Sequence, residues 1–327
     1  MSDESKNKQN EQNKQHKQHK QSEQNEQNKQ SDRSGPGQPI LAAFQFLTRF
    51  PVRAELDFTP ELLRRSVRYY PLVGAAVGLS VWAAAALSAW LLPPLPAAVL
   101  ALIVWVWVTG GLHLDGWMDT ADGLLSYRPR EKMLEIMKDS RVGAMGVLAC
   151  VLLLMLKASL LASLLQGGVW QTGAALLTAP VWSRWFMTRA MRLWPNARQG
   201  EGLAGQFRGL GARDGRGATA WAIVLTAAAL LLALLLIILL AVLPATDALS
   251  QTAALPGTEA AHRGRIEPAL AELLLYACLH PVLAWAAGTR AARWMSAKLG
   301  GLTGDTYGAL NEGLEAALLL LAVLIFR

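Results

Sequence analysis

Residues 218–243 read ATAWAIVLTAAALLLALLLIILLAVL and contain no charged side chain. A helix needs about 20 apolar residues to cross roughly 30 Å of hydrocarbon, so this stretch is long enough to span a membrane. Six further apolar segments flank it along the 327-residue chain. The spanning helices are predicted at 71–92, 95–112, 143–166, 169–190, 218–243, 270–290 and 310–326. The predicted fold class is therefore all-α, a polytopic integral membrane bundle of about seven transmembrane helices.

Composition divides the chain into a polar tail and a membrane domain. Residues 1–38 are almost wholly polar, with glutamine at every third position from Gln9 to Gln30. Such a segment buries too little apolar surface to offset chain entropy, so disorder is predicted for 1–38 and one membrane-embedded domain for 39–327. The two cysteines, Cys150 and Cys278, lie in apolar segments and support neither a disulfide framework nor a thiolate metal site.

The positive charges mark an orientation. Lys and Arg recur in the predicted connections 113–142, 189–216 and 291–309, whereas 93–94 and 167–168 hold none. Since they do not form one patch, the net charge of +7 does not indicate nucleic acid. The positive-inside pattern instead predicts that the N-terminus and these three loops face the cytoplasm.

Short interfacial helices are expected beside the spans. Residues 40–50 form an amphipathic segment that is too short to cross a bilayer. A helix start is predicted at Thr59-Pro60-Glu61, where a capping hydroxyl precedes proline and an acid. A surface helix is predicted over 129–139.

Three aspartates follow the second predicted span, in residues 109–123, TGGLHLDGWMDTADG. At helical spacing, Asp115, Asp119 and Asp122 fall within roughly 60° of one another. Carboxylates this close repel by about 3 kcal/mol per pair, which a divalent cation would relieve. Oxygen ligands without cysteine or paired histidine favour Mg²⁺. A solvated helix end just outside the bilayer is the structural alternative.

A second acidic motif lies in residues 300–313, GGLTGDTYGALNEG. Asp305 and Glu312 are seven residues apart and share a helix face, and Glu312 begins an otherwise apolar span. An acid inside a membrane span is a functional candidate by default. Helix capping and snorkelling remain the alternative.

Basic groups and one histidine complete the candidate site. Lys138 and Arg141, in 138–146, KDSRVGAMG, and Arg198, in 197–203, ARQGEGL, could bind phosphate beside glycine-exposed amides. Positive-inside anchoring explains Lys138 and Arg141 equally well. His113 could accept a proton, or pack at a helix end. Together these groups suit substituted-phosphate transfer from a diphosphate to an alcohol at a membrane surface.

These motifs resemble the cobalamin synthase family, adenosylcobinamide-GDP ribazoletransferase. The resemblance rests on 109–123, on MLEIMKDSR at 133–141, on FQFLTRFPV at 44–52, on 197–203 and on 300–306, in the same order over residues 40–327. It implies a magnesium-dependent enzyme that joins adenosylcobinamide-GDP to α-ribazole, or its 5′-phosphate. The products implied are adenosylcobalamin, or its phosphate, and GMP.

The resemblance also implies roles, a place and partners. Asp115, Asp119 and Asp122 would hold Mg²⁺, Asp305 and Glu312 would complete the metal site, and His113 would be the base. Lys138, Arg141 and Arg198 would meet phosphate. The site would face the cytoplasm at the bacterial inner membrane. The partners expected are the two substrates, the bilayer, and further copies of the chain or other corrinoid-assembly enzymes.

Two other functions fit parts of the pattern. A CDP-alcohol phosphatidyltransferase also displaces a nucleoside monophosphate, but Asp115-Gly116 is followed here by Trp117-Met118-Asp119 rather than by an Ala-Arg pair. A cation transporter would place its acids near the bilayer midplane, whereas 115–122 lie at a predicted cytoplasmic end.

Overall fold

The computed structural model describes residues 37–198, 203–207, 209–249 and 258–326. The predicted disordered tail lies, but for its last two residues, outside this range. Every regular element within it is helical, which confirms the all-α prediction. The elements, in chain order, are α2 (Gln38–Leu47), α3 (Pro60–Ser66), the 3₁₀ turn η1 (Val67–Tyr69), α4 (Tyr70–Leu91), α5 (Pro94–Thr109), α6 (Leu112–Leu124), α7 (Arg130–Ile136), α8 (Ala144–Gly167), α9 (Val169–Leu193), α10 (Leu203–Gln206), α11 (Ala212–Leu249), α12 (Thr258–Leu299) and α13 (Gly304–Ile325).

Five of the described helices are individually long and apolar enough to cross a membrane: α4, α8, α11, α12 and α13. A sixth crossing is counted if α5 and α6 are taken as one broken span, although the two helices meet at 91°. The remaining predicted span, 169–190, corresponds to α9. This helix has 25 residues but is less apolar than the helices counted as able to cross a membrane. The number by this measure is therefore five or six.

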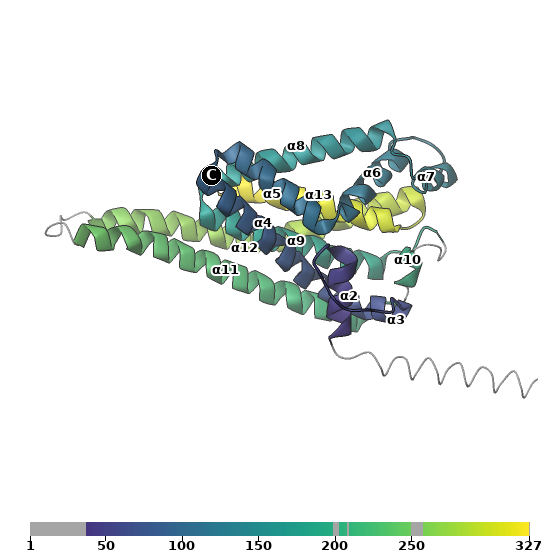
Figure 1. Ribbon diagram of the computed structural model, residues 1–327, viewed down its shortest axis with the longest axis horizontal. Coiled ribbons are helices and arrows are strands. Elements are labelled where there is room, and N and C mark those ends of the chain that lie inside the picture. The colour runs from purple at the N-terminus through teal and green to yellow at the C-terminus, as the bar shows by residue number, and fades with distance from the viewer. Residues whose placement is uncertain (1–36, 199–202, 208, 250–257, 327) are drawn as a thin grey trace, which may run out of the picture.

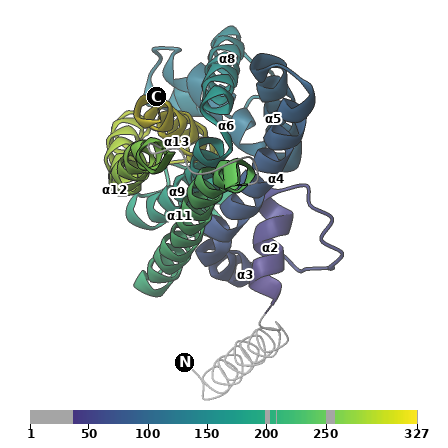
Figure 2. The same ribbon diagram turned by 90° about the vertical axis from the view of Figure 1, so that its left-hand side faces the viewer.

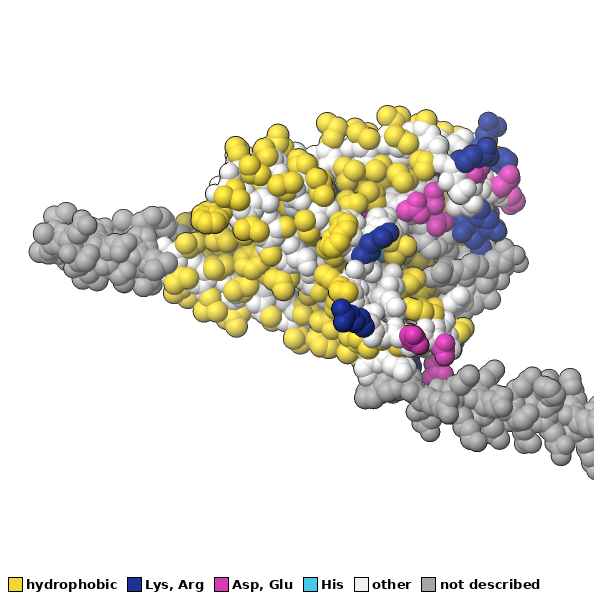
Figure 3. Space-filling model, viewed as in Figure 1, with side chains coloured by type: hydrophobic (Ala, Val, Ile, Leu, Met, Phe, Trp, Pro, Cys, Tyr) yellow, Lys and Arg dark blue, Asp and Glu magenta, His cyan; other side chains and the backbone are white. Residues whose placement is uncertain are grey.

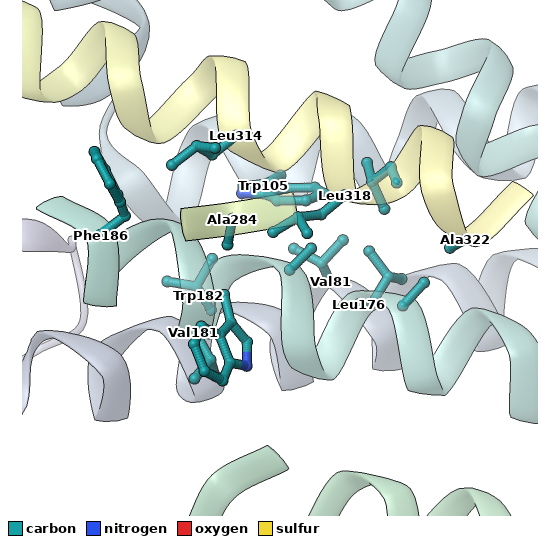
Figure 4. Close-up of a cluster of buried hydrophobic side chains, with 14 of the residues drawn as sticks. Val81, Trp105, Leu176, Val181, Trp182, Phe186, Ala284, Leu314, Leu318 and Ala322 are labelled. Atoms are coloured by element: carbon teal, nitrogen blue, oxygen red, sulfur yellow. The ribbon is translucent and has the colours of Figure 1, made fainter. Parts of the chain in front are cut away.

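The polarity of α9 follows from its central position. It packs against α4, α8, α11, α12 and α13, so its side chains meet protein rather than lipid. The closest approach is to α4, where a Cβ on Gly74 or Gly78 would collide with the carbonyl oxygen of Pro180 or Leu176. Figure 4 shows the core beside this crossing, where Leu176, Val181 and Phe186 of α9 lie among side chains of the neighbouring helices. A buried helix needs less apolarity than one facing lipid.

The polar connections gather at one end of the bundle, where α2, α3, α6, α7 and α10 lie (Figure 1). The view from the opposite end looks along the bundle of long helices (Figure 2). In the space-filling view, charged side chains cluster at the first end and hydrophobic ones cover the rest of the visible face (Figure 3). We call the end that carries α2, α3, α6, α7 and α10 the charged end. The C-terminal end of α13 lies at the other end (Figure 1).

The predicted interfacial helices are present. The segment 40–50 corresponds to α2, and 129–139 contains α7. Thr59 caps α3, because its Oγ1 accepts a hydrogen bond from the Leu62 amide at 3.2 Å. These short helices lie around the charged end and frame the candidate site.

Candidate active site

A double-glycine turn places α6 across the charged end. Gly110 and Gly111 have φ values of +64° and +72°, a left-handed conformation that L side chains rarely adopt. The turn ends α5 and bends the chain by 91°, so that α6 does not continue the span. We therefore treat α6 as lying outside the membrane-spanning segments.

Two further glycines bring α6 against the start of α13. A Cβ on Gly116 would lie 2.7 Å from the Asp305 carbonyl oxygen, and one on Gly308 would lie 2.9 Å from the His113 carbonyl oxygen. The backbones can meet this closely only because neither residue has a side chain. The contact joins the two acidic motifs, which are far apart in the sequence.

Asp119 is the electrostatic centre of this junction. Burial raises its pKa to about 7, and the negative charges of Asp115, Asp305 and Asp122 add to the shift, while Arg198 opposes it. Asp115 is exposed, and Asp119 and Asp305 are half-buried. The carboxylates are thus close enough to repel one another, as the helical spacing predicts, and their charge is not fully balanced by Arg198.

Asp122 has a different environment from the other two aspartates. Its Oδ2 accepts a hydrogen bond from the Gly143 amide and its Oδ1 accepts one from the Gly146 amide, each at 2.7 Å. These amides lie at the start of α8, whose own N-cap residue offers no side-chain cap. Asp122 therefore caps α8 from a neighbouring helix, and each of its oxygens already has a partner.

Arg198, one of the three predicted phosphate ligands, lies beside Asp305 at this junction. One backbone bridge pairs Asn196 with Leu302, which holds the start of the α9–α10 connection against the turn before α13. Arg198 Nη2 then reaches Asp305 Oδ2 at 3.0 Å and the Met137 carbonyl at 3.3 Å. Its Nε is buried and has no hydrogen-bond partner among the described residues. The guanidinium keeps a donor available at the acidic junction.

The other two predicted phosphate ligands lie in the connection between α7 and α8. Arg141 donates to Asp139 Oδ2 at 2.7 Å, and its side chain is 87% exposed. Hydrogen bonds from Arg141 lower the pKa of Asp139 to about 2. Lys138 is exposed in the turn that ends α7. The Arg141 side chain is thus paired with Asp139 and largely exposed to solvent.

Glu312 does not join Asp305, contrary to the expectation of a shared metal site. Two helical turns separate them, about 10 Å along α13. Glu312 Oε2 instead accepts a hydrogen bond from Lys157 of α8 at 2.6 Å, inside the bundle. Lys157 also binds Glu315 Oε2 at 2.7 Å, and Arg184 of α9 binds Glu315 Oε1 at 2.7 Å. We call these four residues the buried ion cluster.

Lys157 and Arg184 were not predicted as site residues, because the basic residues singled out in the sequence lie in the connections and not within the predicted spans. Lys157 is the only charged residue of α8, and Arg184 occupies the inner part of α9. An ionisable residue within a span costs a few kcal/mol unless it is paired, so each of them predicts a buried acid as partner.

His113 lies on the other side of α6 from Asp115. Two residues along a helix turn the side chain by about 200°. His113 is buried and both ring nitrogens lack a hydrogen-bond partner in the described part of the chain. Burial, and then the positive charge of Arg184, lower its pKa to about 3. This placement faces the imidazole toward the buried ion cluster and makes it a poor general base.

The donor set suits Mg²⁺ that is shared with a substrate. No three His, Cys, Asp or Glu side chains of the described residues are arranged to hold a metal ion by themselves. Mg²⁺ commonly binds through one or two carboxylates while substrate phosphates and water supply the remaining ligands. Asp115 and Asp119 offer such carboxylates, and the raised pKa of Asp119 indicates negative charge that a cation would neutralise.

Comparisons with known proteins agree with this arrangement of motifs. Residues 39–323 match the family model described as cobalamin-5-phosphate synthase. An adenosylcobinamide-GDP ribazoletransferase of Brevibacillus brevis is 38% identical over 86% of this chain and 96% of the relative. The protein of the same name from Roseiflexus sp. is 35% identical over 87% of this chain and 89% of the relative. No solved structure matches the chain. This protein belongs to the cobalamin-5-phosphate synthase family.

Proposed function

We propose that this protein is an adenosylcobinamide-GDP ribazoletransferase. It joins adenosylcobinamide-GDP to α-ribazole, or to α-ribazole 5′-phosphate, and releases GMP. The names of its full-length relatives support this activity. The observation within the molecule that carries the proposal is the junction of Asp115 and Asp119 with the Asp305–Arg198 pair at the charged end.

The reaction replaces the phosphoanhydride bond of the diphosphate with a phosphodiester bond. The 5′-hydroxyl oxygen of the ribazole attacks the phosphorus on the cobinamide side of the diphosphate. The bond from this phosphorus to the bridging oxygen breaks, GMP leaves with that oxygen, and the hydroxyl proton is released to water. Mg²⁺, when bound, supplies charge neutralisation on the phosphate oxygens.

The residues at the junction divide this work. Asp115 and Asp119 would hold the metal ion beside the diphosphate. Asp305 orients Arg198 through their 3.0 Å ion pair, and the guanidinium would contact a phosphate oxygen. Asp122 would contribute by fixing α8 against α6. Lys138 and Arg141 would meet a substrate phosphate if the connection between α7 and α8 closes over it.

The site is proposed to face the cytoplasm at the bacterial inner membrane. The support is the distribution of Lys and Arg, which favours the connections at the charged end. A cytoplasmic site would meet soluble nucleotide-activated substrate, while the apolar helices keep the enzyme in the bilayer. Assembly into oligomers or with other corrinoid-assembly enzymes stays a prediction.

The test is an assay of the full chain in lipid vesicles. Adenosylcobinamide-GDP, labelled α-ribazole and Mg²⁺ are supplied, and GMP and labelled adenosylcobalamin are measured. Equal amounts of the two products are expected. Release of CMP from a CDP-alcohol, or ion flux across the vesicles without GMP release, would favour one of the alternative functions instead.

A further inference from the structure

The buried ion cluster links three long helices inside the bundle. Lys157 belongs to α8, Arg184 to α9, and Glu312 and Glu315 to α13. The exposed fraction of each residue is 6% or less. Two cations meet two anions, so the cluster balances its own formal charge and does not need a metal ion.

The cluster also reaches two more helices. The Lys157 ammonium lies 4.5 Å from the centroid of the Trp105 ring on α5. His113, on α6, lies within the electrostatic influence of Arg184, Glu315 and Lys157. Five helices thus converge on four charged groups, and one of these helices carries the aspartates.

Several buried polar atoms at this place lack a partner among the described residues. They are Nε and Nη2 of Arg184, both ring nitrogens of His113, and Oδ1 of Asn311. Asn311 donates to the same Glu315 oxygen that Arg184 binds. Buried polar groups of this kind are regularly satisfied by internal water, which makes about three hydrogen bonds.

The cluster and the aspartate junction are connected through one rigid helix. Thr303 caps α13 with a reciprocal capping box, and Asp305 lies in its first turn. Gly308 packs against the α6 backbone, and Glu312 and Glu315 follow within two turns. The backbones of α6 and α13 are in direct contact at Gly116 and Gly308. A rotation or shift of α13 against α6 would therefore move Asp305 relative to Asp119 and Arg198.

We propose that the buried ion cluster is a positioning site for the reaction. It sets the height and rotation of α13 against α6, α8 and α9, and so holds Asp305 and Arg198 beside the aspartates. This inference rests on the proposed function for its catalytic consequence. A cluster that only stabilises the fold would make a different prediction, because its loss would lower the melting temperature without a specific effect on kcat.

The experiment removes one charge of each sign. The double variant Lys157→Met/Glu312→Gln leaves the Arg184–Glu315 pair intact, so the interior stays balanced. The matched control is Leu318→Ala, a fully buried apolar residue of the same helix. We expect kcat for GMP release to fall about tenfold or more in the double variant, with KM within about twofold. Leu318→Ala should lower the melting temperature while kcat at 25 °C stays within about twofold.

A distance measurement separates the positioning role from activity. Spin labels are placed at Arg128→Cys, after α6, and Gly304→Cys, at the start of α13, with Cys150→Ala and Cys278→Ala. Arg128 is exposed, and a Cβ at Gly304 meets no atom within 4 Å. The double variant should broaden or shift the distance distribution, whereas Leu318→Ala should not. If the double variant fails to fold, the equally balanced Lys157→Gln/Glu312→Gln takes its place.

Two results would overturn the proposal. One is an unchanged distance distribution in a folded cluster variant. The other applies if the parent protein is active: the double variant has the kcat of the parent, or Leu318→Ala lowers kcat as much as the double variant does. If the parent releases no GMP while the distance still shifts, the proposed function fails and the positioning of α13 stands.

Discussion

The aspartate junction and the buried ion cluster are both built around α13, yet their charges are balanced in different ways. At the charged end, the cation that opposes Asp115, Asp119 and Asp305 among the described residues is Arg198, and the pKa of Asp119 is raised to about 7. Two turns further into the bundle, Glu312 and Glu315 are matched by Lys157 and Arg184. The difference indicates which acids are suited to bind a cation. The aspartate junction has more negative than positive charge, whereas the charges of the buried ion cluster are balanced.

The largest effect is expected from neutralising the junction. Asp119→Asn, or Asp115→Asn, should reduce GMP release by about 10³-fold, because a metal ligand and the charge that attracts the cation are lost together. The melting temperature should not fall, since the repulsion among the acids also decreases. Steady-state assays and thermal shift measure the two effects, with the exposed Glu131→Gln as control. Near-normal turnover at saturating Mg²⁺ would contradict the metal role.

Neutralising one side of the buried cluster should affect stability first. Lys157→Met leaves two carboxylates in the interior with only Arg184 to balance them, which costs about 3–5 kcal/mol. Adding Glu312→Gln restores the balance and should recover part of that loss. Thermal unfolding in detergent compares the single and double variants. A single variant as stable as the parent would show that the cluster is hydrated enough to tolerate a free charge.

Arg198 joins the two motifs at the junction, and its loss should have an intermediate effect. Arg198→Gln is expected to reduce kcat/KM by about 10- to 100-fold, because Asp305 loses its partner and the diphosphate loses a donor. The exposed Arg213→Gln, at the same end of the bundle, is the control. Equal losses in both variants would instead indicate a general effect of surface charge.

Removing divalent cations should sharpen the contrast between the two regions. Mg²⁺ at about 100 times its Kd would stabilise the native protein by about 2.7 kcal/mol, which corresponds to a few degrees in Tm. Chelation should therefore lower the Tm of the parent and leave that of Asp119→Asn unchanged. An identical shift in both proteins would place the cation somewhere other than the junction.

The smallest effect is expected at the connection between α7 and α8. The Arg141 side chain is exposed and pairs with Asp139. Exposed pairs contribute little, so Arg141→Gln should change neither Tm nor kcat by more than about twofold. A larger rise in KM with kcat unchanged would indicate that this connection closes over the substrate.

Periodicity and composition predicted much of the fold. The seven apolar segments each correspond to a long helix, because crossing a bilayer requires about 20 residues of backbone bonded within one helix. The polarity of α9 was not predicted, since a helix surrounded by other helices need not meet lipid. The 91° bend at Gly110-Gly111 was not predicted either, because a glycine pair also fits a flexible turn.

The candidate site was predicted in part. The spacing of Asp115 and Asp119, and the Gly-rich turn before Asp305, placed acids on helices that do meet. The same spacing rule grouped Glu312 with Asp305, although two helical turns carry Glu312 into the bundle interior. Periodicity describes a face of one helix, whereas the partner on the opposing helix, here Lys157, is set by tertiary packing.

Asp122 shows how a repeated residue type can serve unlike purposes. Its carboxylate ties α6 to the first amides of α8, the helix that carries Lys157 further along. Since the N-cap residue of α8, Gly143, has no side chain to cap the helix, loss of the Asp122 carboxylate would leave two amides at the start of α8 without a partner. The third aspartate thus fastens the surface helix to a long helix of the bundle.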